Sequence, residues 1–244
     1  MDAKRYARHV ALREVGAAGQ ERLGHTAILV IGLGGLGCPA AEYLASSGVG
    51  RLVLNDFDRV DLTNLPRQVL FDDGDIGSLK VDAAAKTLRR LNPDVTVECL
   101  SHRLDDAALT EAAHRVDIVL DCTDNFSTRL AINRACVGAG KPLVSGAALR
   151  FEGQISVFRN RPGDPCYRCL YSEDDELLGD CAGNGVFAPV PGVIGTLMAL
   201  EAMKLAMLGD TALAGVLKLW DAINGDWQSI HLARDPDCPV CGQR

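Results

Sequence analysis

Four cysteines lie in two pairs that have the spacing typical of metal ligands. Cys166 and Cys169 belong to DPCYRC, and Cys238 and Cys241 belong to DCPVC, so each pair lies in a turn that contains proline. Four thiolates suit tetrahedral zinc and leave no open coordination position for catalysis. A reducing compartment disfavours the alternative of disulfides. A redox-active CxxC is disfavoured because two such pairs would be a coincidence. We therefore predict a structural zinc site that ties the end of the chain to its body.

A glycine-rich motif and a later acid form a second group. Gly32, Gly34 and Gly37 make up GxGxxG, between an apolar run and a helical segment. Glycines there permit a tight turn, and the free N–H groups of a helix N-terminus attract phosphate. Asp56 follows about 20 residues after the motif, where such folds hydrogen-bond a ribose hydroxyl. A glycine turn that binds nothing is the alternative, but the strand–turn–helix context favours a nucleotide.

The loop after this acid carries more polar side chains than a dinucleotide site needs. The stretch DFDRVDLTNLPRQ supplies both charges and amides, namely Asp56, Asp58, Asn64, Arg67 and Gln68. Lys80 begins the next predicted helix. A triphosphate attacked at its α-phosphorus accumulates negative charge in the transition state, and cations stabilise that charge. We therefore expect Arg67 and Lys80 to hold phosphates, with solvated surface charges as the alternative.

Carboxylates follow a later apolar run. The segment DCTDN places Asp121, Asp124 and Asn125 at the carboxyl end of a predicted strand, the edge where open α/β sheets bind ligands. A carboxylate there can hold magnesium through oxygen ligation, and Asp124 is the better candidate because Asp121 lies nearer the strand interior. The competing role for Asp124 is the N-cap of the helix that begins near Ser127.

The remaining cysteines divide into two kinds. Cys38, Cys99, Cys122 and Cys136 lie in predicted helices or strands, where a small apolar side chain fits a core. Cys181 follows the acidic stretch YSEDDELLGD, so we expect it to be accessible and consider it a candidate thiol nucleophile. Neighbouring carboxylates oppose formation of a thiolate, so we predict that Cys181 is dispensable for chemistry on ATP.

Strands and helices that alternate along the chain must position these groups. Apolar runs predict strands, and amphipathic or small-residue segments between them predict helices, up to a long helix at about 192–208. This order indicates an α/β fold, a doubly wound, Rossmann-like and mostly parallel sheet, with mixed or antiparallel strands and the zinc site near its C-terminus. We expect one domain over 1–244, comprising a helical arm (1–23), a nucleotide-binding part (24–150) and a partner-binding part with the zinc clip (151–244).

Composition limits the partners. The 244 residues carry a formal net charge of −7, which gives no electrostatic footprint for nucleic acid or an anionic membrane surface. No stretch reaches the roughly 18 consecutive apolar residues of a membrane span, and the polar start MDAKRYARHV is unlike a secretory signal. We therefore expect a cytoplasmic protein that binds neither nucleic acid nor membrane.

Several segments together resemble the MoeB/ThiF/HesA family of E1-like adenylyltransferases, over about residues 5–242. They are GLGGLGC, DFDRVDLTNLPRQ, Lys80-Val81, DCTDN, VSGAALRFEGQI, PCYRC, GVIGTLMALEAMK and CPVCG. The segment VSGAALRFEGQI is more similar to the molybdopterin-synthase activator branch than to the thiazole branch, although WQSI is faintly thiazole-like.

The resemblance implies an activity. Members bind ATP with magnesium and adenylate the C-terminal carboxylate of a ubiquitin-like sulfur carrier that ends in Gly-Gly, as homodimers with structural zinc. It implies that Asp124 holds magnesium with Asn125 beside it, and that Arg8 enters the site of the partner subunit. The further residues that it implies at the nucleotide are Gly35, Asp56, Thr63, Asn64, Leu65, Pro66, Arg67 and Lys80.

The sequence departs from the family pattern at Pro66, where glutamine is common in relatives, and Arg67 and Gln68 follow unchanged. The chain ends soon after the second CxxC, without the rhodanese domain of eukaryotic relatives, so we expect a separate sulfur donor protein. The alternatives are an NAD-dependent oxidoreductase, a noncatalytic zinc scaffold for a ubiquitin-like partner, and the tRNA-modifying dehydratase branch. The basic loop and the cysteine pairs disfavour the oxidoreductase, Arg67, Lys80 and Asp124 disfavour the scaffold, and the four cysteines disfavour the dehydratase branch.

Overall fold

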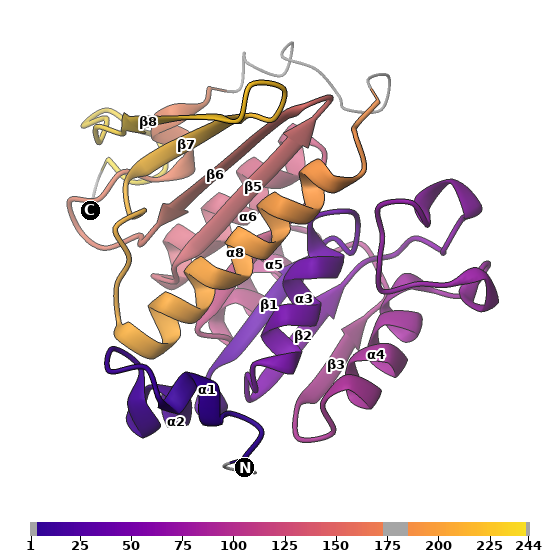
Figure 1. The fold of residues 1–244 in the computed structure, drawn as a ribbon. Coiled ribbons are helices and arrows are strands. Elements are labelled where there is room, and N and C mark those ends of the chain that lie inside the picture. Colours follow the sequence, from indigo (N-terminus) through magenta and orange to yellow (C-terminus); the bar gives the residue numbers. More distant parts are fainter. Residues whose placement is uncertain (1–3, 173–184, 243–244) are drawn as a thin grey trace.

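The computed structural model describes residues 4–172 and 185–242, which form a central sheet covered by helices on both faces (Figure 1). In sheet order its strands are β3 (Thr96–Leu100), β2 (Arg51–Asn55), β1 (Ala27–Ile31), β4 (Ile118–Asp121), β5 (Leu143–Leu149), β6 (Glu152–Phe158), β7 (Val216–Asp221) and β8 (Asp226–His231). Neighbours from β3 to β5 pair in parallel, and β5 to β8 pair antiparallel. The predicted fold class is confirmed.

Helices cover the two faces of the sheet in separate groups (Figure 1). The helices are α1 (Ala7–Val10), α2 (Gly16–His25), α3 (Gly37–Ser46), α4 (Lys80–Leu91), α5 (Asp106–His114), α6 (Phe126–Ala139), α7 (Tyr167–Leu170) and α8 (Pro189–Leu208), with short 3-10 turns η1 (Leu62–Asn64) and η2 (Asp73–Asp75). One buried cluster joins α3, α4 and α8 to the sheet, and a second joins α5 and α6 to its other face.

Strand β1 shows why the apolar run after residue 26 forms the centre of the sheet. Its five residues are all buried, because helices lie on both sides. Ile28 and Val30 pack in the cluster with α3 and α8, whereas Leu29 and Ile31 pack in the cluster with α5 and α6. Successive side chains of a strand point to opposite faces, so a strand covered on both faces must be apolar throughout.

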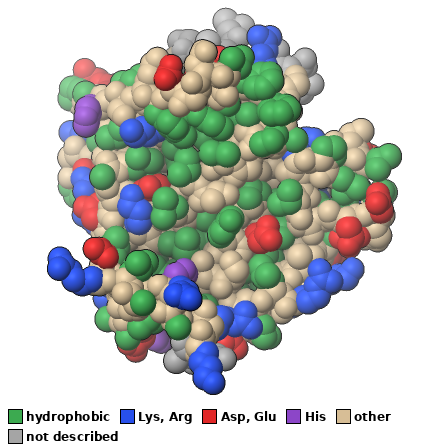
Figure 2. Space-filling model, in the orientation of Figure 1, with side chains coloured by type: hydrophobic (Ala, Val, Ile, Leu, Met, Phe, Trp, Pro, Cys, Tyr) green, Lys and Arg blue, Asp and Glu red, His purple; other side chains and the backbone are tan. Residues whose placement is uncertain are grey.

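Helix α8 is long and apolar enough, by length and composition, to cross a membrane. More than half of that stretch, 56%, is buried against α3 and the sheet, as in the core helix of a soluble protein. A Cβ at Gly195 would lie 2.2 Å from the carbonyl oxygen of Leu36, so glycine lets α8 approach α3 closely. Figure 2 shows hydrophobic side chains gathered over this face, and Leu200 and Leu208 are exposed on α8.

The N-terminal arm, predicted as helical over 1–23, consists of more than one helix. It forms two short helices, and the second continues to His25. The break lies before Gly16, whose φ of 58° is left-handed and cannot continue a right-handed helix. Tyr6 is buried, and its hydroxyl accepts a hydrogen bond from Asn92 Nδ2 at 2.8 Å, so the arm is attached to the end of α4.

Candidate active site

A cavity of about 680 Å³ opens at the carboxyl ends of β1, β2 and β4. The chain leaves β1 for α3 and β2 on one side, and β4 pairs with β1 on the other. Such a reversal of strand order creates a crevice where open α/β sheets bind ligands. The sequence-predicted residues that line this cavity are Gly32, Gly34, Gly35, Asp56, Asp58, Asn64, Arg67, Gln68, Lys80, Asp124 and Asn125.

The glycines of the first loop are needed for different reasons. Gly32 has a φ of 91°, which disfavours any other residue. A Cβ at Gly37 would lie 1.9 Å from the carbonyl oxygen of Gly32, so only glycine lets the turn close onto α3. A Cβ at Gly34 would meet no atom, and this position lines the cavity, so its backbone is open to a ligand. Gly37 itself supports the loop from outside the cavity lining.

Asp56 fixes the geometry between the glycine loop and the loop that follows β2. Its two carboxylate oxygens accept hydrogen bonds from the N–H of Leu33 at 2.7 Å and of Asp58 at 2.8 Å. The side chain is buried at the cavity wall. Each carboxylate oxygen has a further lone pair, so a ribose hydroxyl can still donate to it.

Two cations line the cavity. The Lys80 ammonium is buried, 3.1 Å from Asp58 Oδ2 and 4.0 Å from Asp56 Oδ2. The Arg67 guanidinium donates to the carbonyl oxygen of Thr63 at 3.0 Å. Asn64 Oδ1 accepts from Gln68 Nε2 at 2.6 Å, which orders the loop between them. Thr63, Leu65 and Pro66 lie outside the cavity lining, where Thr63 closes η1 onto the Asp61 carboxylate.

The loop after β4 brings a free carboxylate to the cavity. Asp124 is exposed, and no hydrogen bond or ion pair engages its side chain within the described residues. Asn125, and not Asp124, is the N-cap of α6, because its Oδ1 accepts from the N–H of Thr128 at 2.9 Å. The alternative role of Asp124 as a helix cap is therefore wrong, and its oxygens are available to a cation.

Arg8 is far from this arrangement within one chain. It is exposed on α1, and α2 leads directly into the start of β1. The cavity is lined by residues that follow the other, carboxyl end of that strand, such as Gly32 and Gly34. Arg8 does not line the cavity of its own chain, so its placement in the site of a partner stays a prediction.

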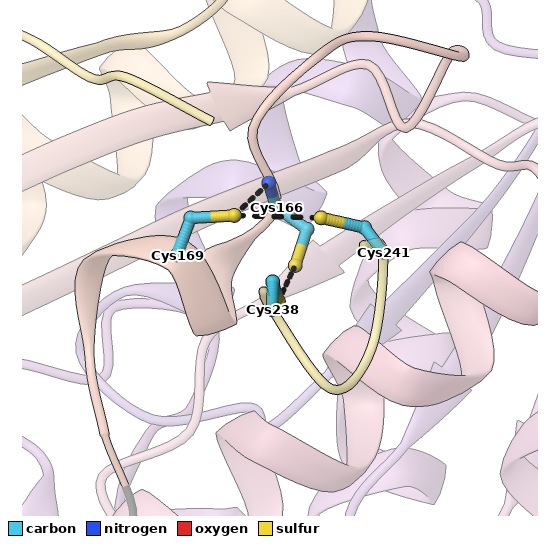
Figure 3. Close-up of side chains that lie close together, drawn as sticks. All are labelled: Cys166, Cys169, Cys238 and Cys241. Atoms are coloured by element: carbon cyan, nitrogen blue, oxygen red, sulfur yellow. Dashed lines mark hydrogen bonds between the residues drawn. The ribbon is translucent and has the colours of Figure 1, made fainter. Parts of the chain in front are cut away.

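The four paired cysteines meet although 72 residues separate the pairs (Figure 3). All four sulfurs lie within 4.8 Å of one another, with Cys166 Sγ 3.8 Å from Cys238 Sγ and Cys169 Sγ 3.4 Å from Cys241 Sγ. A disulfide needs about 2.05 Å, whereas sulfurs at 2.3 Å from a tetrahedral zinc lie about 3.8 Å apart. The cluster could hold a metal ion in the way that the spacing predicted.

The other described cysteines lack the lowered thiol pKa of a nucleophile. Burial raises the pKa of the Cys38 thiol to about 12, and burial raises the pKa of Cys122 and Cys136 as well. Cys99 is partly buried, and burial raises its pKa too. These four are protonated side chains of the core at neutral pH, as predicted. Cys181 lies outside the described residues.

The cavity includes side chains that the sequence did not single out. The Arg103 guanidinium lies 5.7 Å from the ring centroid of Phe57, and both residues line the cavity next to Asp56. Arg129 of α6 also lines it and is buried. Phe57 directly follows Asp56, the acid predicted to bind ribose, so its place in the sequence could have indicated that it lines the cavity. No sequence signal indicates Arg103 or Arg129, because only the folded structure brings them to the cavity.

Residues 6–240 match the family model described as the ThiF family. The chain belongs to the ThiF family. The matched part includes the glycine loop, the first cysteine pair and Cys238, and it ends one residue before Cys241. The family suggested by the motifs is thereby confirmed.

Two relatives of this ThiF-family chain are named as adenylyltransferases. It is 48% identical over 240 residues to the molybdopterin-synthase adenylyltransferase of Escherichia coli K12, covering 98% of this chain and 96% of the relative. It is 46% identical over 241 residues to the sulfur carrier protein ThiS adenylyltransferase of the same organism, covering 99% and 96%. Both names describe adenylyl transfer, and the second names a sulfur carrier as the acceptor.

A solved structure has the same fold as this ThiF-family chain. The crystal structure of Escherichia coli MccB with ATP aligns with a TM-score of 0.84 and 25% identity, over 98% of this chain and 73% of that one. MccB therefore binds ATP on an architecture that this chain shares over nearly its whole length.

Proposed function

We propose that the protein uses ATP to adenylate the C-terminal glycine carboxylate of a ubiquitin-like sulfur carrier protein that ends in Gly-Gly. The products are a carrier acyl-adenylate and pyrophosphate. The observation that carries this proposal is one cavity that combines a glycine loop, the two cations Arg67 and Lys80, and the free carboxylate of Asp124. The shared adenylyltransferase names of the relatives support the same activity.

The residues of the cavity suggest a division of labour. Asp56 would hold the ribose, and the N–H groups before α3 would hold phosphate. A carrier carboxylate oxygen then bonds to the α-phosphorus while the bond to the pyrophosphate oxygen breaks. Negative charge grows on the phosphate oxygens during that step, and Arg67 and Lys80 would stabilise it. Lys80, now paired with Asp58, would exchange that partner for phosphate.

Magnesium fits the free carboxylate that the β4 loop provides. We propose that Asp124 ligates it, because the carboxylate is exposed to the cavity and has no other partner within the described residues. Bound magnesium would neutralise phosphate charge. Asn125 contributes by capping α6 behind it, at 2.9 Å from the N–H of Thr128.

We propose zinc for the cysteine cluster, in a structural role. Four sulfurs within 4.8 Å of one another fit a closed tetrahedral site, which has no position for a substrate. Sulfur would then reach the activated carboxylate from a separate donor protein. The part over 151–244 would receive the carrier, and a cytoplasmic homodimer would let Arg8 complete the site of its partner.

Pyrophosphate–ATP exchange tests the proposal. Purified protein is assayed with molybdopterin-type and thiamine-type carriers in turn, each compared with a variant that lacks the terminal glycine. We expect exchange with at least one intact carrier and none with its truncated form. Exchange that needs no carrier, or tight binding of NAD with hydride transfer in a parallel titration, would reject the proposal.

A further inference from the structure

A buried arginine beneath the cavity has no part in the function proposed above. Arg129 lies one turn into α6, is 6% exposed, and lines the cavity beside the loop after β4. A buried guanidinium needs partners for its charge and its donors, or burial would be costly. Its partners therefore indicate what it does.

Arg129 and Asp121 between them hold every polar backbone and side-chain group of Thr123. Asp121 is fully buried, and its Oδ1 accepts from the Thr123 N–H at 3.1 Å and from the Thr123 hydroxyl at 2.7 Å. Arg129 donates to the Thr123 carbonyl oxygen. Ser145 donates to the other oxygen of Asp121 at 3.1 Å, which fixes that carboxylate in turn. All polar groups of Thr123 are therefore engaged in hydrogen bonds, which restricts the movement of this residue.

Asp124 lies between this fixed residue and a second one. Asn125 on its other side is held as the cap of α6, with its Oδ1 2.9 Å from the N–H of Thr128. The backbone around Asp124 is thus tied on both sides, while its own carboxylate stays free in the cavity. A ligand whose position is fixed before binding gives up little freedom when the cation arrives.

The support of Arg129 extends to the cysteine cluster. The Arg129 guanidinium lies beside the hydroxyl of Tyr167, the residue after Cys166. The Tyr167 N–H donates to Asn133 Oδ1 at 3.0 Å, and Asn133 Nδ2 donates to Cys166 Sγ at 3.6 Å. Helix α6 therefore carries contacts to the cysteine cluster and to the Asp124 loop on one buried side.

We propose that Arg129 is a positioning residue that holds the Thr123–Asn125 loop so that Asp124 is preorganised for magnesium, with Tyr167 linking this support to the cysteine cluster. The inference rests on the proposed function, because it takes Asp124 as the magnesium ligand. The competing role is purely structural, in which Arg129 only neutralises the buried Asp121. The two roles differ in whether the loop, and the magnesium dependence, respond to the loss of Arg129.

The test uses the full chain with the substitutions Arg129→Gln, Arg129→Lys and Tyr167→Phe. Tyr167→Phe removes one hydroxyl and keeps the ring. The centroid of this ring lies 5.8 Å from that of Phe158 and 4.9 Å from that of Tyr171. The matched control is Arg134→Gln, on the same helix, where the arginine is exposed and paired with Asp106 at 3.1 Å. Calorimetry measures the binding of ATP as magnesium is varied, and hydrogen exchange measures the backbone of the loop without metal.

We expect Arg129→Gln to raise the magnesium concentration for half-maximal ATP binding by roughly tenfold or more, as for other groups that orient metal ligands. Tyr167→Phe should raise it less, Arg129→Lys should recover part of the loss, and excess magnesium should restore binding. Hydrogen exchange at 122–126 should accelerate in Arg129→Gln and stay unchanged in Arg134→Gln. Unchanged magnesium dependence in the folded variants, or a loss of ATP binding equal at all magnesium concentrations, would overturn the inference.

This design distinguishes a failure of the inference about Arg129 from a failure of the proposed function. If Arg129→Gln does not fold, Arg129→Lys and Tyr167→Phe decide, because a wild-type magnesium dependence in both would reject the inference. The magnesium titration of ATP binding needs no carrier protein. Failure of every carrier in pyrophosphate exchange would therefore reject the proposed function, while the titration would still report on Arg129.

Discussion

At the scale of single residues, Lys80 illustrates how the site is prepared for phosphate. Its ammonium is buried between Asp58 at 3.1 Å and Asp56 at 4.0 Å, so carboxylate oxygens now occupy positions around it that phosphate oxygens can take. A buried charge that already has partners costs less to keep than an isolated one. The lysine is thereby held at the cavity before any nucleotide is present.

The variants Lys80→Ala and Arg67→Ala should each lower adenylation by on the order of a hundredfold or more, with a smaller loss of ATP affinity. The reason is that both cations would act most strongly on the charge of the transition state. Single-turnover rates and ATP binding measured side by side give the two quantities. Lys86→Ala is the control on the same helix, because Lys86 is exposed and pairs with Asp75 at 3.3 Å. Near-normal turnover in both site variants would refute the assignment.

The second prediction at the scale of single residues concerns Cys181. We expect Cys181→Ala to keep pyrophosphate exchange and most thiocarboxylate formation when an external persulfide donor is supplied. The acidic residues of 173–180 oppose a thiolate nearby, since like charges disfavour it. Mass spectrometry of the carrier distinguishes the two steps. Normal adenylation without any thiocarboxylate would mean that the cysteine takes part in sulfur transfer.

At the scale of elements, the turn from β1 into α3 decides whether the phosphate site forms. Gly37→Ala would place a methyl group 1.9 Å from the Gly32 carbonyl oxygen, so the turn must shift. We expect a loss of about 1–3 kcal/mol in the free energy of unfolding and weaker ATP binding. Gly138→Ala on the exposed side of α6 meets no atom within 4 Å and should be neutral or slightly stabilising. Equal effects of both changes, measured by denaturant unfolding, would contradict this account of the turn.

The cysteine cluster connects two other elements, α7 and the C-terminal turn. Cys169→Ser, or removal of metal with a chelator, should lower the Tm by roughly 5 °C or more, before adenylation chemistry is affected. Cys99→Ser is the control, because Cys99 lies outside the cluster. Elemental analysis and thermal unfolding check both points. Protein without zinc, or an unchanged Tm after chelation, would show that the cluster is not a structural zinc site.

The elements also show what the sequence could and could not predict. The apolar run of β1 predicted a strand buried on both faces, since each of its five residues needs an apolar neighbour. The helical arm was predicted without its division into two helices, because a left-handed φ at Gly16 leaves no trace in the apolar spacing. Arg129 was missed for another reason. Its partner Tyr167 is brought to it by the packing of α7 on α6, and no spacing along the chain indicates that contact.

At the scale of the whole molecule, the N-terminal arm lies at the amino ends of the central strands (Figure 1), whereas the residues that line the cavity follow their carboxyl ends. If Arg8 completes the site of a partner subunit, Arg8→Ala and Asp124→Ala should each be inactive alone. An equal mixture that exchanges subunits should regain roughly a quarter of wild-type activity, because half of the dimers are hybrids with one intact site. Two inactive parents that stay inactive after verified subunit exchange would refute the arrangement.

The central claim is that a carrier carboxylate attacks the α-phosphorus of ATP. The most direct measurement starts from a carrier whose C-terminal carboxylate is labelled with oxygen-18. The labelled carrier is incubated with the protein and ATP, and the acyl-adenylate is then cleaved at its carbonyl by hydroxylamine. We expect AMP that contains one oxygen-18 atom, together with unlabelled pyrophosphate, because the attacking oxygen stays on the α-phosphorus. Unlabelled AMP, or ADP with the label in inorganic phosphate, would contradict it.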